Sequence, residues 1–166
     1  MVTSLSRRNA IALLAGATIL PRAVLADAVV DLDWEDLLPK NQSAIPPVLN
    51  SLIEHDAHSL SSQQPASTGV RSDWNGMIVR LPGFIVPIDT LGAAVTAFIL
   101  VPFVGACVHV PPPPANQLVF VTTPKPYETE GLYAPVNVTG MFGVSSMTTH
   151  LAQIGYALSA EKIEPF

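Results

Sequence analysis

Residues 77–88 read MIVRLPGFIVPI, and this stretch decides the fold that the sequence predicts. It is rich in valine and isoleucine, Arg80 is its only charged residue, and Pro82 and Gly83 interrupt its centre. β-Branched residues favour extended strands, whereas a glycine inside a long strand is typical of a bulge or a sharp bend. We therefore expect one long strand that bends at Gly83.

Four more strand patterns follow along the chain. Residues 95–103 are almost continuously apolar, which predicts a strand that is buried on both faces. The other three patterns lie at residues 118–122, 135–144 and 155–163. Gly140 interrupts the second of these three, in the way that Gly83 interrupts the first strand. The segment 145–154 is expected to form a short helix before the last strand.

Five strands, two of them interrupted by glycine, predict a mainly β fold. Glycines supply the corners at which a strand passes from one side of a small barrel to the other. Barrels of the oligonucleotide/oligosaccharide-binding (OB) type have five strands. A two-sheet sandwich is the alternative, but it usually needs about seven strands. We therefore expect an OB-like barrel domain over residues 70–166.

Residues 27–69 are expected to form an N-terminal docking segment and a linker ahead of the barrel. Trp34 lies among acids and leucines in the stretch DLDWEDLLP, residues 31–39, and is predicted to pin a short turn or strand onto the core. Residues 46–56 begin with two prolines and keep one apolar stripe, which indicates a helix. The polar stretch at 59–69 is typical of a linker.

The first 26 residues have the layout of a cleaved export signal. Arg7 and Arg8 precede an apolar run over residues 11–20, and small residues lead up to Ala26. The paired arginines favour the twin-arginine export route. Because the apolar run is shorter than the about 20 residues of a membrane span, we expect cleavage near Ala26. The mature chain would then be periplasmic, with no stable membrane span.

The charge balance bears on the classes of ligand that the mature chain could bind. The whole chain has a formal net charge of −5, and the predicted signal contains three arginines and no acidic residue. Removal of the signal therefore leaves a strongly acidic protein. Phosphate backbones and anionic membrane surfaces attract basic proteins, so we exclude nucleic acid as a partner.

Residues 105–117, GACVHVPPPPANQ, hold the single cysteine of the chain and a nearby histidine. The four prolines predict a rigid polyproline II rod. The amide side chains of Asn116 and Gln117 would hold the end of this rod by hydrogen bonds. A rod of this kind, flanked by valines, is suited to docking a partner. The favoured interpretation is a non-enzymatic binding or accessory protein that docks a partner or ligand through this loop. Its candidate residues are Cys107, His109, Pro111, Pro112, Pro113, Pro114, Asn116 and Gln117.

Metal binding is the first alternative. If the loop is extended, the side chains of Cys107 and His109 lie on one face, where a thiolate and an imidazole suit zinc or copper. Two ligands are too few for a closed site. His150, or the pair His55 and His58, would have to complete it.

Thiol-dependent enzyme chemistry is the second alternative. In this hypothesis His109 lowers the pKa of the Cys107 thiol, and Asn116 orients the pair. No Cys-x-x-Cys partner is present in the sequence.

Several strings in the chain resemble one bacterial family. They are VRLPGFIVPID, FILVPFVGACVHVPPPPANQLVFV, DLDWEDLLP, APVNVTGMF and GYALSAEKIEP. Over residues 31–166 the chain is similar to the exported family called domain of unknown function 3299 (DUF3299). The resemblance implies an exported, often periplasmic protein without an assigned activity. It also implies an association of some members with transporter systems, including metal uptake, which makes a transporter component a candidate partner.

Overall fold

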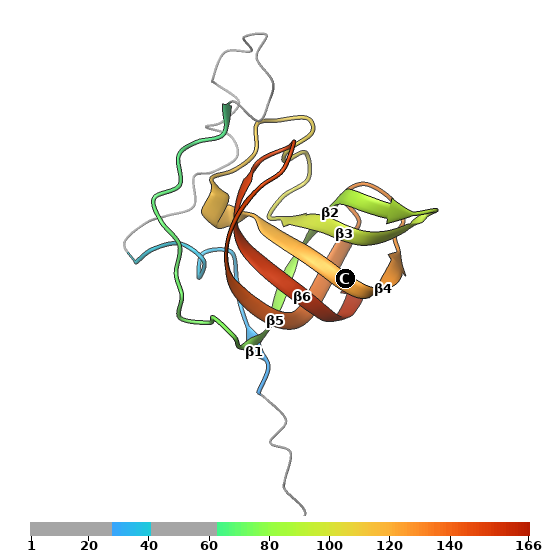
Figure 1. Cartoon of the computed structure of the whole chain (residues 1–166), viewed down its shortest axis with the longest axis horizontal. Coiled ribbons are helices and arrows are strands. Elements are labelled where there is room, and N and C mark those ends of the chain that lie inside the picture. The colour runs from blue at the N-terminus through green and yellow to red at the C-terminus, as the bar shows by residue number, and fades with distance from the viewer. Residues whose placement is uncertain (1–27, 41–62) are drawn as a thin grey trace, which may run out of the picture.

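The computed structural model describes residues 28–40 and 63–166 (Figure 1). The predicted export signal and the predicted helix at 46–56, with His55 and His58, lie outside these residues. Among the described residues, no helix is long and apolar enough to cross a membrane.

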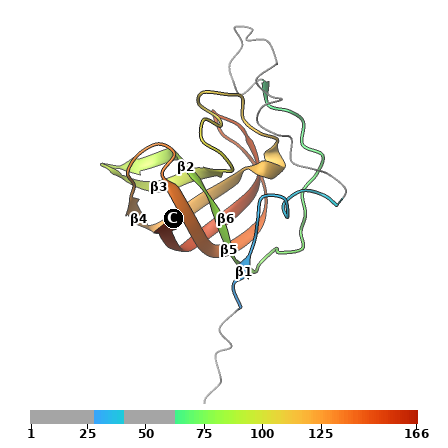
Figure 2. The same ribbon diagram turned by 180° about the vertical axis from the view of Figure 1, so that it is seen from behind.

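Five strands close into a barrel, as the sequence predicts. The barrel strands are β2 Ile78–Leu91, β3 Ala94–Val101, β4 Val119–Glu128, β5 Pro135–Thr148 and β6 Gln153–Pro165, and a short sixth strand, β1 Val30–Asp31, precedes them. They form one sheet in the order β1-β2-β3-β4-β6-β5, and β5 also pairs with β2, which closes the barrel. Neighbouring barrel strands are antiparallel except β4 and β6, which are parallel. The short β1 pairs in parallel with the first half of β2 (Figure 2).

The two glycines expected at the bends lie where strands approach each other closely. A Cβ atom at Gly83 would lie 2.8 Å from Cγ of Leu100 on β3. At Gly140 it would overlap the backbone carbonyl of Ser159 on β6, beside a register shift between Thr139 and Gly140. The close approaches show that the two positions require glycine, and β2 is one long strand that changes its partner from β5 to β3 at Phe84, next to Gly83. The bend expected at Gly83 stays a prediction.

The helix predicted at residues 145–154 is wrong. β5 continues to Thr148, and β6 begins at Gln153, so this segment is the end of a hairpin. The side chain of Thr149 explains the tight turn, because its Oγ1 accepts hydrogen bonds from the backbone N–H groups of Leu151 (3.2 Å) and Ala152 (3.1 Å). A threonine that binds nearby backbone groups favours a turn over a helix. Within the barrel domain, residues 70–166, the structure has one short helical turn, the 3-10 turn η2, Ala115–Gln117.

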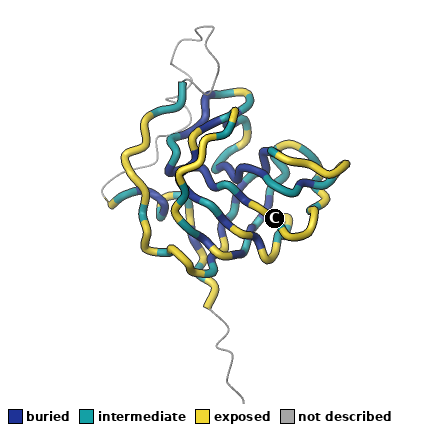
Figure 3. Tube along the Cα trace, viewed as in Figure 1, coloured by how far each residue is buried: buried dark blue, intermediate teal, exposed yellow. Residues whose placement is uncertain are grey.

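Two apolar clusters lie on opposite faces of the barrel wall. The barrel interior is filled by alternate residues of all five strands, among them Leu81, Ile85, Phe98, Leu100, Val121, Val138 and Leu158. The outer cluster consists of Val86, Ile99, Val101, Ala106, Cys107, Leu118, Ala152 and Ile154. Residues 102–118 join β3 to β4, and we call them the connection. It covers the outer face of β2 and β3, and parts of it are buried (Figure 3).

The described stretches ahead of the barrel, within residues 28–40 and 63–77, make hydrogen bonds to it, and Trp34 is one of the contacts, as the sequence predicts. Trp34 is half-buried, and its Nε1 donates a hydrogen bond to the carbonyl of Pro82 at 2.8 Å. Leu37 is fully buried, and its carbonyl accepts a hydrogen bond from the hydroxyl of Tyr156 at 2.7 Å. The same hydroxyl accepts the backbone N–H of Arg71 at 2.7 Å. One buried tyrosine therefore joins two N-terminal stretches to β6.

Candidate functional site

The middle of the connection folds into turns. The carbonyl of Gly105 accepts the backbone N–H groups of His109 (2.9 Å) and Val110 (3.1 Å). Positive φ angles of 99° at Gly105 and 69° at Cys107 reverse the chain here. The expectation that Cys107 and His109 are extended, with their side chains on one face, is therefore wrong. Cys107 is 2% exposed, whereas His109 is exposed to solvent.

The thiol of Cys107 lies in the outer cluster, away from water. Burial raises its pKa to about 12, well above the ordinary value of 9.0. A charged thiolate is disfavoured where water cannot solvate it. The thiol-enzyme hypothesis needed a lowered pKa, and the surroundings of Cys107 shift the pKa in the opposite direction.

Tyr133 belongs to the same site, and sequence reasoning missed it. Its hydroxyl donates a hydrogen bond to the carbonyl of Ala106 at 2.8 Å, and its ring centroid lies 6.1 Å from that of His109. Burial, followed by the neighbouring Cys107, raises the pKa of Tyr133 to about 12. Among the described residues, Cys107 and Tyr133 are the only non-glycine residues with positive φ. The turn before Tyr133 carries no sequence signal that would place it beside a cysteine 26 positions earlier.

The proline run does not form an exposed rod. Pro111, Pro112 and Pro113 are buried, and Pro114 is half-buried. The carbonyl of Pro113 accepts a hydrogen bond from Nε2 of Gln64 at 2.9 Å. The prediction of an exposed docking rod is therefore wrong, because the prolines pack into the protein.

The two amide residues after the prolines bind the N-terminal stretches. Nδ2 of Asn116 donates to the carbonyl of Gly69 at 2.8 Å, and Nε2 of Gln117 donates to the carbonyl of Trp34 at 2.8 Å. Both side chains are buried. They act as clamps, as expected, but what they hold is the chain ahead of the barrel.

The proposed third metal ligand, His150, is exposed in the turn between β5 and β6. Nowhere in residues 28–40 and 63–166 do three or more His, Cys, Asp or Glu side chains gather so that they could hold one metal ion. Zinc or copper binding by Cys107, His109 and His150 stays a prediction, without support from the ligand geometry.

The surface around the ring pair of His109 and Tyr133 has few charges on the side of the connection, whereas the exposed Glu128 and Glu130 precede Tyr133. Between Asp89 and Lys125 the chain has no Asp, Glu, Lys or Arg. Val104 is 60% exposed beside the turn, and Leu132, next to Tyr133, is 46% exposed. We call Val104, His109, Leu132 and Tyr133 the His109 surface. Exposed apolar side chains beside aromatic rings, with few charges, are typical of the centre of a protein interface.

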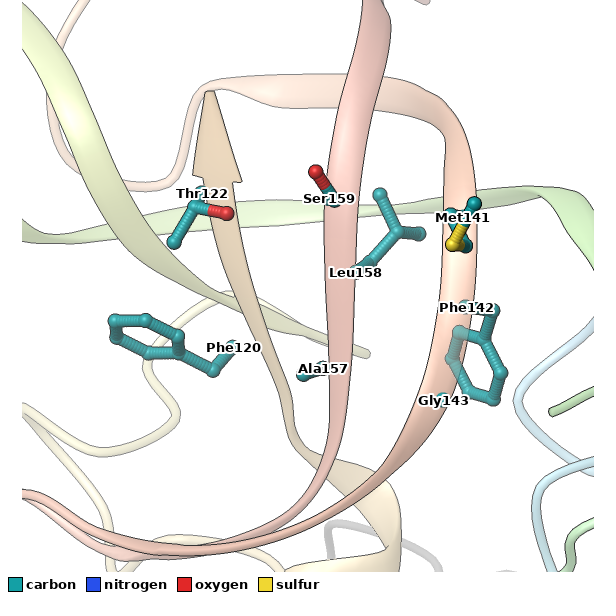
Figure 4. Close-up of a pocket in the computed structure, with 8 residues that line it drawn as sticks. All are labelled: Phe120, Thr122, Met141, Phe142, Gly143, Ala157, Leu158 and Ser159. Atoms are coloured by element: carbon teal, nitrogen blue, oxygen red, sulfur yellow. The ribbon is translucent and has the colours of Figure 1, made fainter. Parts of the chain in front are cut away.

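A second feature is a shallow apolar hollow on the outside of β4, β6 and β5 (Figure 4). Its volume is about 270 Å³, and the side chains lining it include Phe120, Met141 and Ala157. Small residues, Gly143 and Ala157, create the depression. Its only polar side chains are Thr122 and Ser159, so it offers no acid, base or metal ligand.

Comparisons with known proteins agree with the fold. A family model described as "Protein of unknown function (DUF3299)" matches residues 34–165. A crystal structure of a DUF3299 family protein from Pseudomonas aeruginosa is similar to this chain, with a TM-score of 0.74 and 36% sequence identity. The match covers 84% of this chain and 97% of that one. No curated protein matches the chain.

Proposed function

The chain belongs to the DUF3299 family, and on the geometry of the connection we propose that it is a non-enzymatic binding or accessory protein. It docks a protein partner through the His109 surface. The family description names no activity, so the proposal depends on the site itself.

The observation that carries the proposal is that two residues with positive φ angles, Cys107 and Tyr133, meet at an exposed surface with few charges. A non-glycine residue in the left-handed region costs about 1–3 kcal/mol, and such residues cluster at functional sites. Here Cys107 and Tyr133 both take this conformation, and the hydroxyl of Tyr133 bonds to the residue before Cys107. That hydrogen bond joins the two turns that contain these residues.

The chemistry of the surface indicates the kind of partner. Val104 and Leu132 supply apolar area, and the ring of Tyr133 is only half-buried. The imidazole of His109 can donate or accept a hydrogen bond. A matching partner presents apolar side chains around one polar group. Cys107 would act from below the surface, because its buried thiol fixes the turn that presents His109.

The compartment follows from the export signal expected in residues 1–26. We infer that the partner is periplasmic, with a transporter component as a candidate. Cell fractionation tests the export route: an Arg7→Lys, Arg8→Lys variant should stay in the cytoplasm. Unchanged periplasmic delivery of this variant would contradict the twin-arginine route.

Site-directed photo-crosslinking in the producing cell tests the docking surface. A photoreactive residue at position 104 should give one discrete adduct, and His109→Ala should abolish it without changing the urea unfolding midpoint. Position 91 is the matched control, because Leu91 is an apolar residue that is 68% exposed at the tip of the β2–β3 hairpin. The same adduct from position 91, or an adduct that His109→Ala leaves intact, would contradict the proposal.

A further inference from the structure

The barrel opens along one seam, between β4 and β6. These strands pair in parallel only from Val119 with Tyr156 to Thr122 with Ser159. Beyond this point β4 turns back to β3, while β6 continues along β5 to Pro165. Across the described chain, no strand pairs with residues 160–165 of β6 on the side that faces β4. A hollow of about 250 Å³ separates the two strands.

The two strand edges at this seam differ in what they can bind. The β4 edge contains Pro124 and Pro126, which have no backbone N–H to donate. On β6, residues 160–164 all carry a backbone N–H, and the first proline is Pro165. Prolines protect an edge from an added strand, whereas an unpaired edge with its N–H groups is a template for one. An added strand can therefore pair with β6.

We propose that a second copy of this chain adds its own β6 to this edge, antiparallel, about a two-fold axis. Such an interface places the same surface of both copies in contact. Directly opposed residues of an antiparallel pair share one face of the sheet. A two-fold axis perpendicular to the sheet must therefore lie between the two copies of one residue. That residue is then directly opposite its own copy in the partner strand.

The charges on β6 select one register. With the axis at Ile163, Lys162 of each copy opposes Glu164 of the other. An axis at Glu161, Lys162 or Glu164 would place two like charges directly opposite each other, which destabilises a pair. An axis further toward Ala160 would use residues that already pair with β4. Ile163 is therefore the centre of the dimer.

The side chains on this edge are already arranged as the register requires. Nζ of Lys162 lies 2.8 Å from Oε1 of Glu164, and the two side chains are 64% and 44% exposed. They share one face because they are two positions apart on a strand. In the dimer, each lysine faces a carboxylate from both copies. Ile163 packs its half-buried side chain against the barrel interior and holds the strand in place.

Sedimentation equilibrium of the full chain, from about 1 μM to 1 mM, tests this dimer. The wild type should associate to a dimer, and Lys162→Glu should raise the dimer Kd about tenfold or more, because it brings four carboxylates together. The swap Lys162→Glu with Glu164→Lys should restore wild-type association. Lys125→Glu, which also lies at the hollow but on β4, should leave the Kd unchanged.

Two outcomes would overturn the proposal. One is a monomer across the whole concentration range. The other is a dimer that Lys162→Glu and Lys125→Glu affect equally, which would show that the copies do not meet along β6. Lys162 and Lys125 are exposed and Glu164 is only half-buried, so the variants keep the fold of the barrel.

Discussion

The barrel interior and the outer cluster are built from adjacent residues of the same strands. On β3, Phe98 and Leu100 point into the barrel, whereas Ile99 and Val101 point into the outer cluster, and all four are fully buried. The interior is closed by the five strands themselves. The outer cluster is closed by the connection, a segment of turns that carries Cys107. One wall therefore separates a core that is closed by the sheet from a core that is closed by a loop.

This difference explains where a partner can bind. OB folds commonly bind oligonucleotides or oligosaccharides on the outer face of their second and third strands, which correspond to β3 and β4 here. In this chain the connection covers part of that face with apolar side chains. A ligand on the usual face would have to displace them and expose the outer cluster to water. Binding on the outside of the connection, at the His109 surface, leaves both clusters intact.

The largest expected effect comes from a cavity in the barrel interior. Phe98→Ala removes a ring that is fully buried in the barrel interior. Truncation of a buried phenylalanine costs about 3–5 kcal/mol, because the strands cannot collapse into the space. Urea unfolding of the variant measures the loss. A loss below about 1 kcal/mol would contradict a rigid interior.

A cavity in the outer cluster tests whether the loop-closed core is weaker. Ile99→Ala should cost about 2–3 kcal/mol, at the low end for such a change, because the connection can settle into the space. It should also speed alkylation of the Cys107 thiol in the absence of denaturant, because local opening of the connection exposes the sulfur.

Leu100→Ala is the matched control for this prediction, because it makes a similar cavity one residue away on the other face of β3. In Ile99→Ala, alkylation of Cys107 should be faster than the free energy of unfolding alone explains. In Leu100→Ala, the free energy of unfolding should account for the whole alkylation rate. If the alkylation rates of both variants follow their free energies of unfolding, the connection does not open separately from the barrel.

The interior was predictable from the sequence because its signal is local. Strand periodicity placed all five barrel strands, and the almost continuously apolar run at 95–103 indicated burial on both faces, which Phe98–Val101 of β3 confirm. Gly83 and Gly140 marked the close approaches. The hairpin end at 145–154 was mistaken for a helix, because the turn depends on the single side chain of Thr149.

The candidate site was predictable only in part. The sequence indicated Cys107 and His109 as neighbours, but it could not show that positive φ angles turn one inward and the other outward. A left-handed cysteine or tyrosine has no sequence signal of the kind that glycine gives. Tyr133 reaches the site through the closure of the barrel, since its backbone N–H donates to the carbonyl of Ile85 on β2 at 2.7 Å. Such a contact depends on tertiary structure, which local patterns do not contain.

The smallest expected effect is a loss of stability at high pH. It arises from the Cys107 thiol, which lies in the outer cluster. The pKa of Cys107 is about 12 in the folded chain, above the ordinary 9.0 of an exposed thiol. The folded chain therefore holds this proton more tightly than the unfolded chain. The stability that results is fully present below pH 9 and is lost as the pH rises toward 12. From pH 8 to pH 10, the free energy of unfolding should fall by about 1 kcal/mol through this group.

Comparison with Cys107→Ala measures mainly the thiol, because both proteins keep Tyr133 with its burial, which is the larger cause of the raised pKa of Tyr133. The variant should lose about 1 kcal/mol less than the wild type between pH 8 and pH 10, measured by urea unfolding at each pH. The barrel interior contains no cysteine, so the difference reports only on the cover of the outer cluster. An equal loss in both proteins would mean that water reaches the sulfur in the folded state. The connection would then be an open loop, and it could not hold His109 in a fixed position for a partner.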